Sequence, residues 1–119
     1  AMGAADGYII VTPEYNHGMP AALKNAIDLL DYQLMKKPVA IVSHGVVGGA
    51  RANEQLRLVV NSNLGALPIS NSLTFYGKVD ELINEQGVLS QGQEVNAKAL
   101  HGVIENIVWY AEALKNARG

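Results

Sequence analysis

The sequence predicts an α/β fold in which about three parallel strands form one sheet flanked by three helices. Short runs of aliphatic and β-branched residues alternate with longer segments whose apolar residues recur every three or four positions. This order of strand then helix, repeated three times, is typical of right-handed βαβ units and therefore of a parallel sheet. The length of 119 residues fits a single domain over residues 1–119 and is too short for two.

Three short apolar segments are the candidate strands. Residues 7–11 and residues 38–42 are continuous apolar runs. Runs of this kind indicate strands that are buried on both faces, as in a parallel sheet. In residues 67–75 the apolar side chains lie on one side of a two-residue alternation, which Asn71 and Ser72 interrupt. This segment is the third candidate strand.

Three segments carry helical periodicity. The first begins at Pro20, a residue suited to the first helical position, and its apolar stripe comprises Leu23, Ile27, Leu30 and Leu34. The second begins near Ala50 and ends at Gly65, because glycine commonly terminates helices. The third has a wide apolar face over four turns within residues 100–114, as expected of a helix that covers a sheet.

Composition and charge exclude several classes of function. The net charge is -2, so no basic field is available to bind nucleic acid or anionic lipid. The sequence has no cysteine, which excludes disulfides, thiolate nucleophiles and cysteine-ligated metals. His17 and His44 are too few, and have too little support from carboxylates, to suggest a metal site. No apolar run approaches the roughly 20 residues of a membrane span, and no signal peptide is visible. We therefore expect a cytoplasmic protein.

Two polar loops that contain glycine follow the first two candidate strands. They span residues 12–19 and residues 43–49. Ligands of open parallel sheets bind beyond the carboxyl ends of the strands, and both loops fall at that edge. The glycines allow backbone N–H groups to approach a planar ligand closely. Residues 77–93, after the third strand, lack clear periodicity and are interpreted as a solvated connection.

The two loops and the helices after them resemble the NADPH-dependent FMN reductases, which have a flavodoxin-like fold. The resemblance rests on the blocks Thr12–Asn16, Pro20–Asp28, Ser43–Gly45, Gly48–Ala52 and Gln55–Arg57. In that family the Pro-Glu-Tyr-Asn turn wraps the isoalloxazine ring of FMN. The resemblance therefore implies an FMN-dependent NAD(P)H oxidoreductase that passes electrons to a quinone, an azo compound or a flavin.

The same resemblance implies which residues contact the cofactor. These residues are Pro13, Glu14, Tyr15 and Asn16 of the first loop and Ser43, His44, Gly45 and Gly48 of the second. No catalytic side chain is expected, because the cofactor carries the chemistry and the protein supplies binding and orientation. Structural roles remain open: Glu14 and Asn16 also suit turns without a ligand, and Tyr15 also suits a loop residue that covers the core.

Compared with the family pattern, the chain corresponds to the C-terminal part only. The family's first strand and its phosphate-binding loop at a helix N-terminus have no counterpart before Gly7. We therefore expect a partial flavodoxin-like sheet in which residues 7–11 form an edge with unpaired backbone groups. The expected partner of this edge is a second copy of the chain or a chain that carries the N-terminal half. The apolar stripe of the first helix is an alternative dimer seam. The alternative function is a flavin-free fragment or assembly module without catalytic activity.

Overall fold

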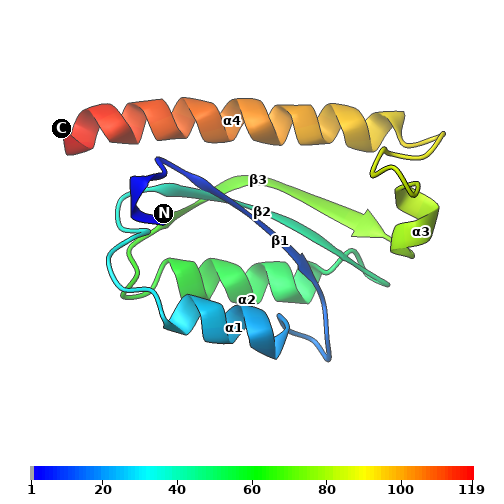
Figure 1. The fold of residues 1–119 in the computed structure, drawn as a ribbon, viewed down its shortest axis with the longest axis horizontal. Coiled ribbons are helices and arrows are strands. Elements are labelled where there is room, and N and C mark those ends of the chain that lie inside the picture. The colour runs from blue at the N-terminus through cyan, green and yellow to red at the C-terminus, as the bar shows by residue number, and fades with distance from the viewer. Residues whose placement is uncertain (1) are drawn as a thin grey trace.

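A computed structural model describes residues 2–119, and these residues form the predicted α/β fold around one sheet (Figure 1). Within this part of the chain the sheet has three parallel strands, which are β1 (Tyr8–Pro13), β2 (Pro38–Gly45) and β3 (Leu67–Tyr76). The strand order is β1-β2-β3, so β2 lies at the centre. The first six residues of β2 are buried, as expected of a continuous apolar run that has neighbours on both sides.

Helices cover both faces of the sheet. The helices α1 (Ala21–Asp28) and α2 (Ala50–Val60) lie on one face, and α4 (Glu94–Arg118) crosses the other (Figure 1). Two short elements complete the described chain, the 3-10 helix η1 (Met2–Ala4) and the helix α3 (Val79–Leu82). The alternation of side chains along the strands therefore divides the core into two layers.

The two core layers are built from alternate residues of β2. Ile41 faces α1 and α2 and belongs to a cluster with Leu56 and Val60, all of them inaccessible to solvent. Val42 faces α4 and belongs to a second cluster with Ile107. Burial of side chains of this size contributes about 1.5–3 kcal/mol each relative to an exposed position. The hydrophobic effect thus holds α2 and α4 against opposite faces of the same strand.

The expectation that residues 7–11 are buried on both faces is wrong. Ile9 is 44% exposed and Val11 is 67% exposed, on the same face of β1 as α4. The reason is topological, because β1 is an edge strand and α4 lies over β2 and β3 instead. The edge position itself was expected, and the strand order confirms it.

Two helix ends differ from the prediction. The first helix was predicted to reach Leu34, but α1 ends at Asp28, and the N–H of Asp31 donates to the side-chain oxygen of Gln33 instead of continuing the helix. Leu34 lies in a turn, and its side chain is nevertheless buried. The second helix was predicted to end at Gly65, but α2 ends at Val60. The third helix is present and longer than predicted.

The segment predicted as a solvated connection, residues 77–93, is partly ordered. It contains the short helix α3, and Ile83 forms an isolated antiparallel bridge with Leu89. Leu82 is only 7% exposed and is part of the core. Periodicity could not reveal this, because the apolar residues come from one turn of helix and one tight turn.

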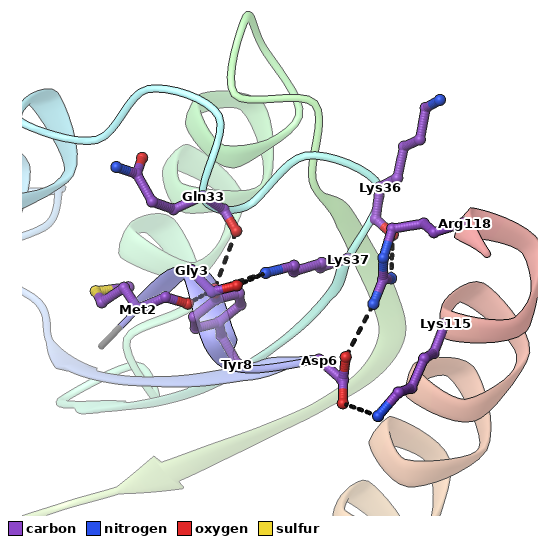
Figure 2. A network of polar contacts seen from close by, with 9 residues as sticks. All are labelled: Met2, Gly3, Asp6, Tyr8, Gln33, Lys36, Lys37, Lys115 and Arg118. Carbon is purple, nitrogen blue, oxygen red and sulfur yellow. Dashed lines mark hydrogen bonds and ion pairs between the residues drawn. The ribbon is translucent and has the colours of Figure 1, made fainter.

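An ionic network joins Asp6, which lies just before β1, to the end of α4 (Figure 2). Asp6 accepts hydrogen bonds from Lys115 Nζ at 2.9 Å and from Arg118 Nη2 at 3.0 Å. Arg118 also donates to the carbonyl oxygen of Lys36 at 2.9 Å, just before β2. The hydrogen bond from Lys115 is the main cause that lowers the pKa of Asp6. The network fixes the C-terminal end of α4 against the sheet.

Candidate functional site

The carboxyl ends of the three strands meet at one edge of the sheet. Pro13 of β1 is the register partner of His44 of β2, which is in turn the partner of Phe75 of β3. The backbone N–H of Glu14 donates to the carbonyl oxygen of His44 at 3.2 Å. The two loops predicted from the sequence are therefore neighbours, joined by a hydrogen bond at their bases.

The tip of the first loop is a tight turn. Tyr15 and Gly18 exchange two backbone hydrogen bonds of 2.9 and 3.1 Å. The two residues between them, Asn16 and His17, have φ values of 49° and 71°, the pattern of a type I′ turn. Asparagine and histidine are among the few side chains that tolerate this left-handed backbone. The turn leaves Tyr15 61% exposed at the edge of the sheet.

The side chain of Glu14 points from the first loop to the beginning of α2. It is 6% exposed, lies 2.6 Å from Arg51 Nη2, and accepts the backbone N–H of Ala52 at 2.9 Å. The N-cap residue of α2, Gly49, has no side chain to supply this acceptor, so Glu14 caps the helix from another loop. The hydrogen bond from Arg51 is the main cause that lowers the pKa of Glu14.

The second loop bends at two adjacent glycines. Gly48 and Gly49 have φ values of 71° and 70°, which side chains rarely tolerate. A Cβ at Gly49 would lie 2.8 Å from the Cβ of Ser43, and one at Gly48 would lie 2.9 Å from the Cβ of Thr74. The Ser43 hydroxyl is fully buried and donates to the carbonyl oxygen of Gly48 at 2.8 Å. Ser43 thus supports the loop from inside.

The predicted site residues differ in position. Tyr15 and Asn16 are exposed at the strand ends, and Gly45 is half-buried at the base of the second loop. By contrast, the side chains of Glu14 and Ser43 point into the protein and hold the loops. His44 continues the side of β2 that faces α4 and lines a cavity there. Cofactor contact by each of these residues stays a prediction.

Sequence reasoning did not identify Arg51 as a site residue, although it lies in one of the blocks that carry the resemblance. Its partner is 37 residues away along the chain, and spacing alone does not reveal such a pair. An arginine in the first turn of a helix is unfavourable to the helix dipole. That mismatch is the signal that points to an acidic partner elsewhere.

The arrangement at the strand ends suits a planar ligand. The first loop presents exposed Tyr15, and exposed Tyr76 lies at the end of β3. A Cβ at Gly48 in the second loop would lie 3.1 Å from the ring of Tyr76. The loops bend where side chains are sterically excluded, so backbone groups can approach a planar ligand. No group of three or more metal-ligating side chains occurs within residues 2–119, and none of the helices described there is long and apolar enough to cross a membrane.

The sequence matches a known protein family. The family described as NADPH-dependent FMN reductase matches residues 1–80. The NADH:(hydroxy)cinnamate reductase subunit CrdA of Vibrio ruber is 43% identical over 91 residues, covering 71% of this chain and 45% of that protein. A quinone reductase of Escherichia coli is 53% identical over 62 residues, covering 47% of this chain and 33% of that protein.

A solved structure agrees with this family. The flavoenzyme NAD(P)H:(acceptor) oxidoreductase FerB of Paracoccus denitrificans superimposes with a TM-score of 0.72 at 28% sequence identity. The match covers 94% of this chain and 64% of that one. The chain therefore has the flavodoxin-like arrangement over nearly its whole length and spans less than two thirds of each of these three relatives.

Proposed function

The chain belongs to the NADPH-dependent FMN reductase family, and we propose that it takes part in FMN-dependent oxidation of NAD(P)H with transfer of electrons to an organic acceptor. FMN and NAD(P)H are the cofactors that the descriptions of the family and of a yeast relative name. The proposed acceptors are quinones, azo compounds or flavins. The names of the relatives from Escherichia coli and Vibrio ruber, a quinone reductase and a (hydroxy)cinnamate reductase, support an aromatic acceptor.

The observation that carries the proposal is the joining of the two loops at the strand ends. Glu14 binds the second loop through its backbone and α2 through its carboxylate. We infer that this contact sets the spacing of a slot for a planar ring, with Tyr15 on one side and the backbone near Gly45 on the other. Bound FMN would supply the hydride chemistry, and the loops would bind and orient its ring and limit its contact with water.

Titration of FMN into the purified chain tests the proposal. Flavin fluorescence is expected to be quenched with saturation, and the loaded protein is expected to oxidise NAD(P)H in the presence of a quinone. A suitable variant is Tyr15→Ala, which keeps the backbone turn and removes the exposed ring. Tyr32→Ala is the matched control, because Tyr32 is 70% exposed outside the site. Equal quenching by both variants would remove Tyr15 from the site.

A second candidate function, a flavin-free assembly module, is favoured by the exposed edge of β1. Its strand has no charged residue, and Ile9 and Val11 present apolar side chains to solvent. Natural edge strands usually carry charges or are covered. We propose that β1 pairs either with a second copy or with a chain that carries further strands of the family's fold. A colourless chain that leaves FMN fluorescence unchanged would favour the module over the enzyme.

The proposal also places the protein in the cytoplasm. The support is indirect: the sequence lacks cysteine, which suits a reducing compartment. Detection of the full chain in a soluble cell fraction, separated from membrane and secreted fractions, tests this part independently of activity.

A further inference from the structure

A side chain of α2 reaches the far end of the first loop. The Oε1 atom of Gln55 accepts the backbone N–H of Met19 at 2.7 Å, across 36 residues of sequence. Met19 is only 8% exposed, and its side chain belongs to the core cluster of Ile41 and Leu56. A backbone N–H that is withdrawn from water without an acceptor is costly. Gln55 therefore holds the residue at which the loop ends.

The close approach of Gln55 explains a glycine in the loop. A Cβ added at Gly18 would lie 2.7 Å from Oε1 of Gln55, and its three nearest atoms would all belong to that one side chain. The backbone of Gly18 is outside the left-handed region, so its φ value does not require glycine. Gly18 instead leaves the space that the amide group of Gln55 occupies.

The contact made by Gln55 extends to Tyr15 through one further step. Gly18 exchanges two backbone hydrogen bonds with Tyr15, of 2.9 and 3.1 Å. At its other end this turn follows Glu14, whose carboxylate accepts the N–H of Ala52. Ala52 and Gln55 both belong to α2. One helix therefore holds the turn that presents Tyr15 at both of its ends.

We propose that Gln55 is a positioning residue of the candidate site, which keeps the turn of Tyr15 where it can border a flavin ring. The inference rests on the proposed function, because that function gives the turn a ligand to border. Without the oxygen of Gln55 the far end of the loop is released, and a smaller fraction of the molecules has the loop in its binding position. The apparent affinity for the ligand falls in proportion to that fraction.

Binding of FMN and of riboflavin, which lacks the phosphate, tests the inference by fluorescence quenching in the full chain. Gln55→Met keeps the length of the side chain and removes the amide oxygen. It is expected to weaken both flavins by the same factor, about fivefold, the scale of one hydrogen bond. Gln55→Glu retains an acceptor oxygen and is expected to restore most of the affinity. Unchanged affinity in Gln55→Met, or an equal loss in Gln55→Glu, contradicts the proposal.

Gln33→Met is the matched control, because it also removes a glutamine oxygen that accepts a backbone N–H. Oε1 of Gln33 accepts the N–H of Asp31 at 2.6 Å. This contact lies in the connection between α1 and β2, at the end of the sheet opposite to the candidate site (Figure 1). Stability is expected to fall in both methionine variants, and flavin affinity only in Gln55→Met. Equal losses of affinity would mean that Gln55 contributes to stability alone, and the proposal would be wrong.

Gly18→Ala reaches the same contact by a second route. The new Cβ would displace the amide group of Gln55, which is the flexible end of a side chain. Flavin binding is expected to weaken in this variant and to change little when Gly18→Ala is added to Gln55→Ala, which has already lost the contact. Losses of affinity that add in the double variant would show that the two residues act independently, against the proposal.

Hydrogen exchange at the amide of Met19, read by NMR without flavin, separates this inference from the proposed function. Exchange at Met19 is expected to be faster in Gln55→Met than in the unmodified chain. The amide of Ala52, which Glu14 accepts, is expected to stay protected and is the internal control. Unchanged protection at Met19 overturns the inference whatever the flavin result. Faster exchange at Met19 in a chain that binds no flavin would keep the positioning of the turn by Gln55 and remove the flavin reductase.

Discussion

The carboxylate of Glu14 lies 2.6 Å from Nη2 of Arg51, and the same carboxylate accepts the N–H of Ala52. One side chain therefore connects the loop after β1 to the first turn of α2, across 37 residues of sequence. The pair is half shielded, since the Glu14 side chain is 6% exposed and that of Arg51 is 43% exposed. It ties the first loop of the candidate site to the helix that follows the second loop.

Glu14→Gln is expected to destabilise the fold at neutral pH and to matter less in acid. The folded-state pKa of Glu14 is lowered, chiefly by the hydrogen bond from Arg51. Its contribution to stability is therefore fully present above the unfolded-state pKa and is lost as the pH falls through the lowered folded-state pKa. Urea denaturation of both proteins at several pH values measures this, and a pH-independent difference would contradict it.

Gly49→Ala is expected to cost more stability than Gly92→Ala. Both glycines have positive φ, 70° and 89°, so both variants incur a backbone penalty of roughly 1–2 kcal/mol. Only at Gly49 would the new Cβ also lie 2.8 Å from Ser43, because Gly92 has open space around it. The difference in unfolding free energy between the two variants isolates the steric clash. Equal costs would mean that the second loop is not tightly packed.

Leu56→Ala is expected to reduce the free energy of unfolding by about 2–5 kcal/mol, the cost of removing a buried leucine side chain. Leu56 is fully buried between α2 and the sheet, whereas Leu58, two residues later, is 77% exposed. Leu58→Ala is the control and is expected to change stability by no more than about 0.5 kcal/mol. Chemical denaturation of the two variants gives the comparison directly.

The chain is expected to be larger than a 12.7 kDa monomer in solution, because β1 presents an uncharged edge. Val11→Lys places a charge on that edge, a device by which natural edge strands avoid pairing, and is expected to shift the protein toward the monomer. Light scattering after size-exclusion chromatography measures the mass. A stable monomer for the unmodified chain would contradict pairing through β1 with a second copy.

Asp6→Asn is expected to loosen the C-terminal turns of α4. Lys115 and Arg118 would both lose a charged partner, so amide exchange in the last turns should become faster. Asp28→Asn is the control, because Asp28 pairs with Lys24 within α1 and that pair is exposed, where such pairs contribute little. Hydrogen exchange read by mass spectrometry compares the two, and protection unchanged by the loss of Asp6 would contradict the anchor.

Sequence patterns predicted the strands and the long helix because each depends on a local periodicity. The continuous apolar run of β2 and the apolar face of α4 reflect the burial of these elements, so both are visible in the sequence. The end of α1 was not predictable in this way, because the apolar residue Leu34 continues the helical spacing but reaches the core from a turn. The burial of Leu82 was missed for a related reason, since one short helix carries too few residues to show a period.

The position of the two loops of the candidate site was predictable from the sequence. The contacts of their side chains were less predictable. The motif placed Tyr15 and Asn16 at the sheet edge, where the structure has them. The direction of the Glu14 side chain depends on Arg51, which is distant in sequence. The side of the sheet to which His44 belongs depends on the register of β2. Both are decided by tertiary packing, which a sequence motif does not show.

The contact between Asp6 and Arg118 also bears on how the chain folds during synthesis. These residues are 112 positions apart, so α4 gains its anchor only after the residues between them have been made. Until then the α4 face of the sheet, including Val42 and Ile69, has no cover, and such long-range closure is slow and leaves apolar surface open to aggregation. Synthesis of this chain in a chaperone-free translation system is therefore expected to give aggregates that added chaperone prevents.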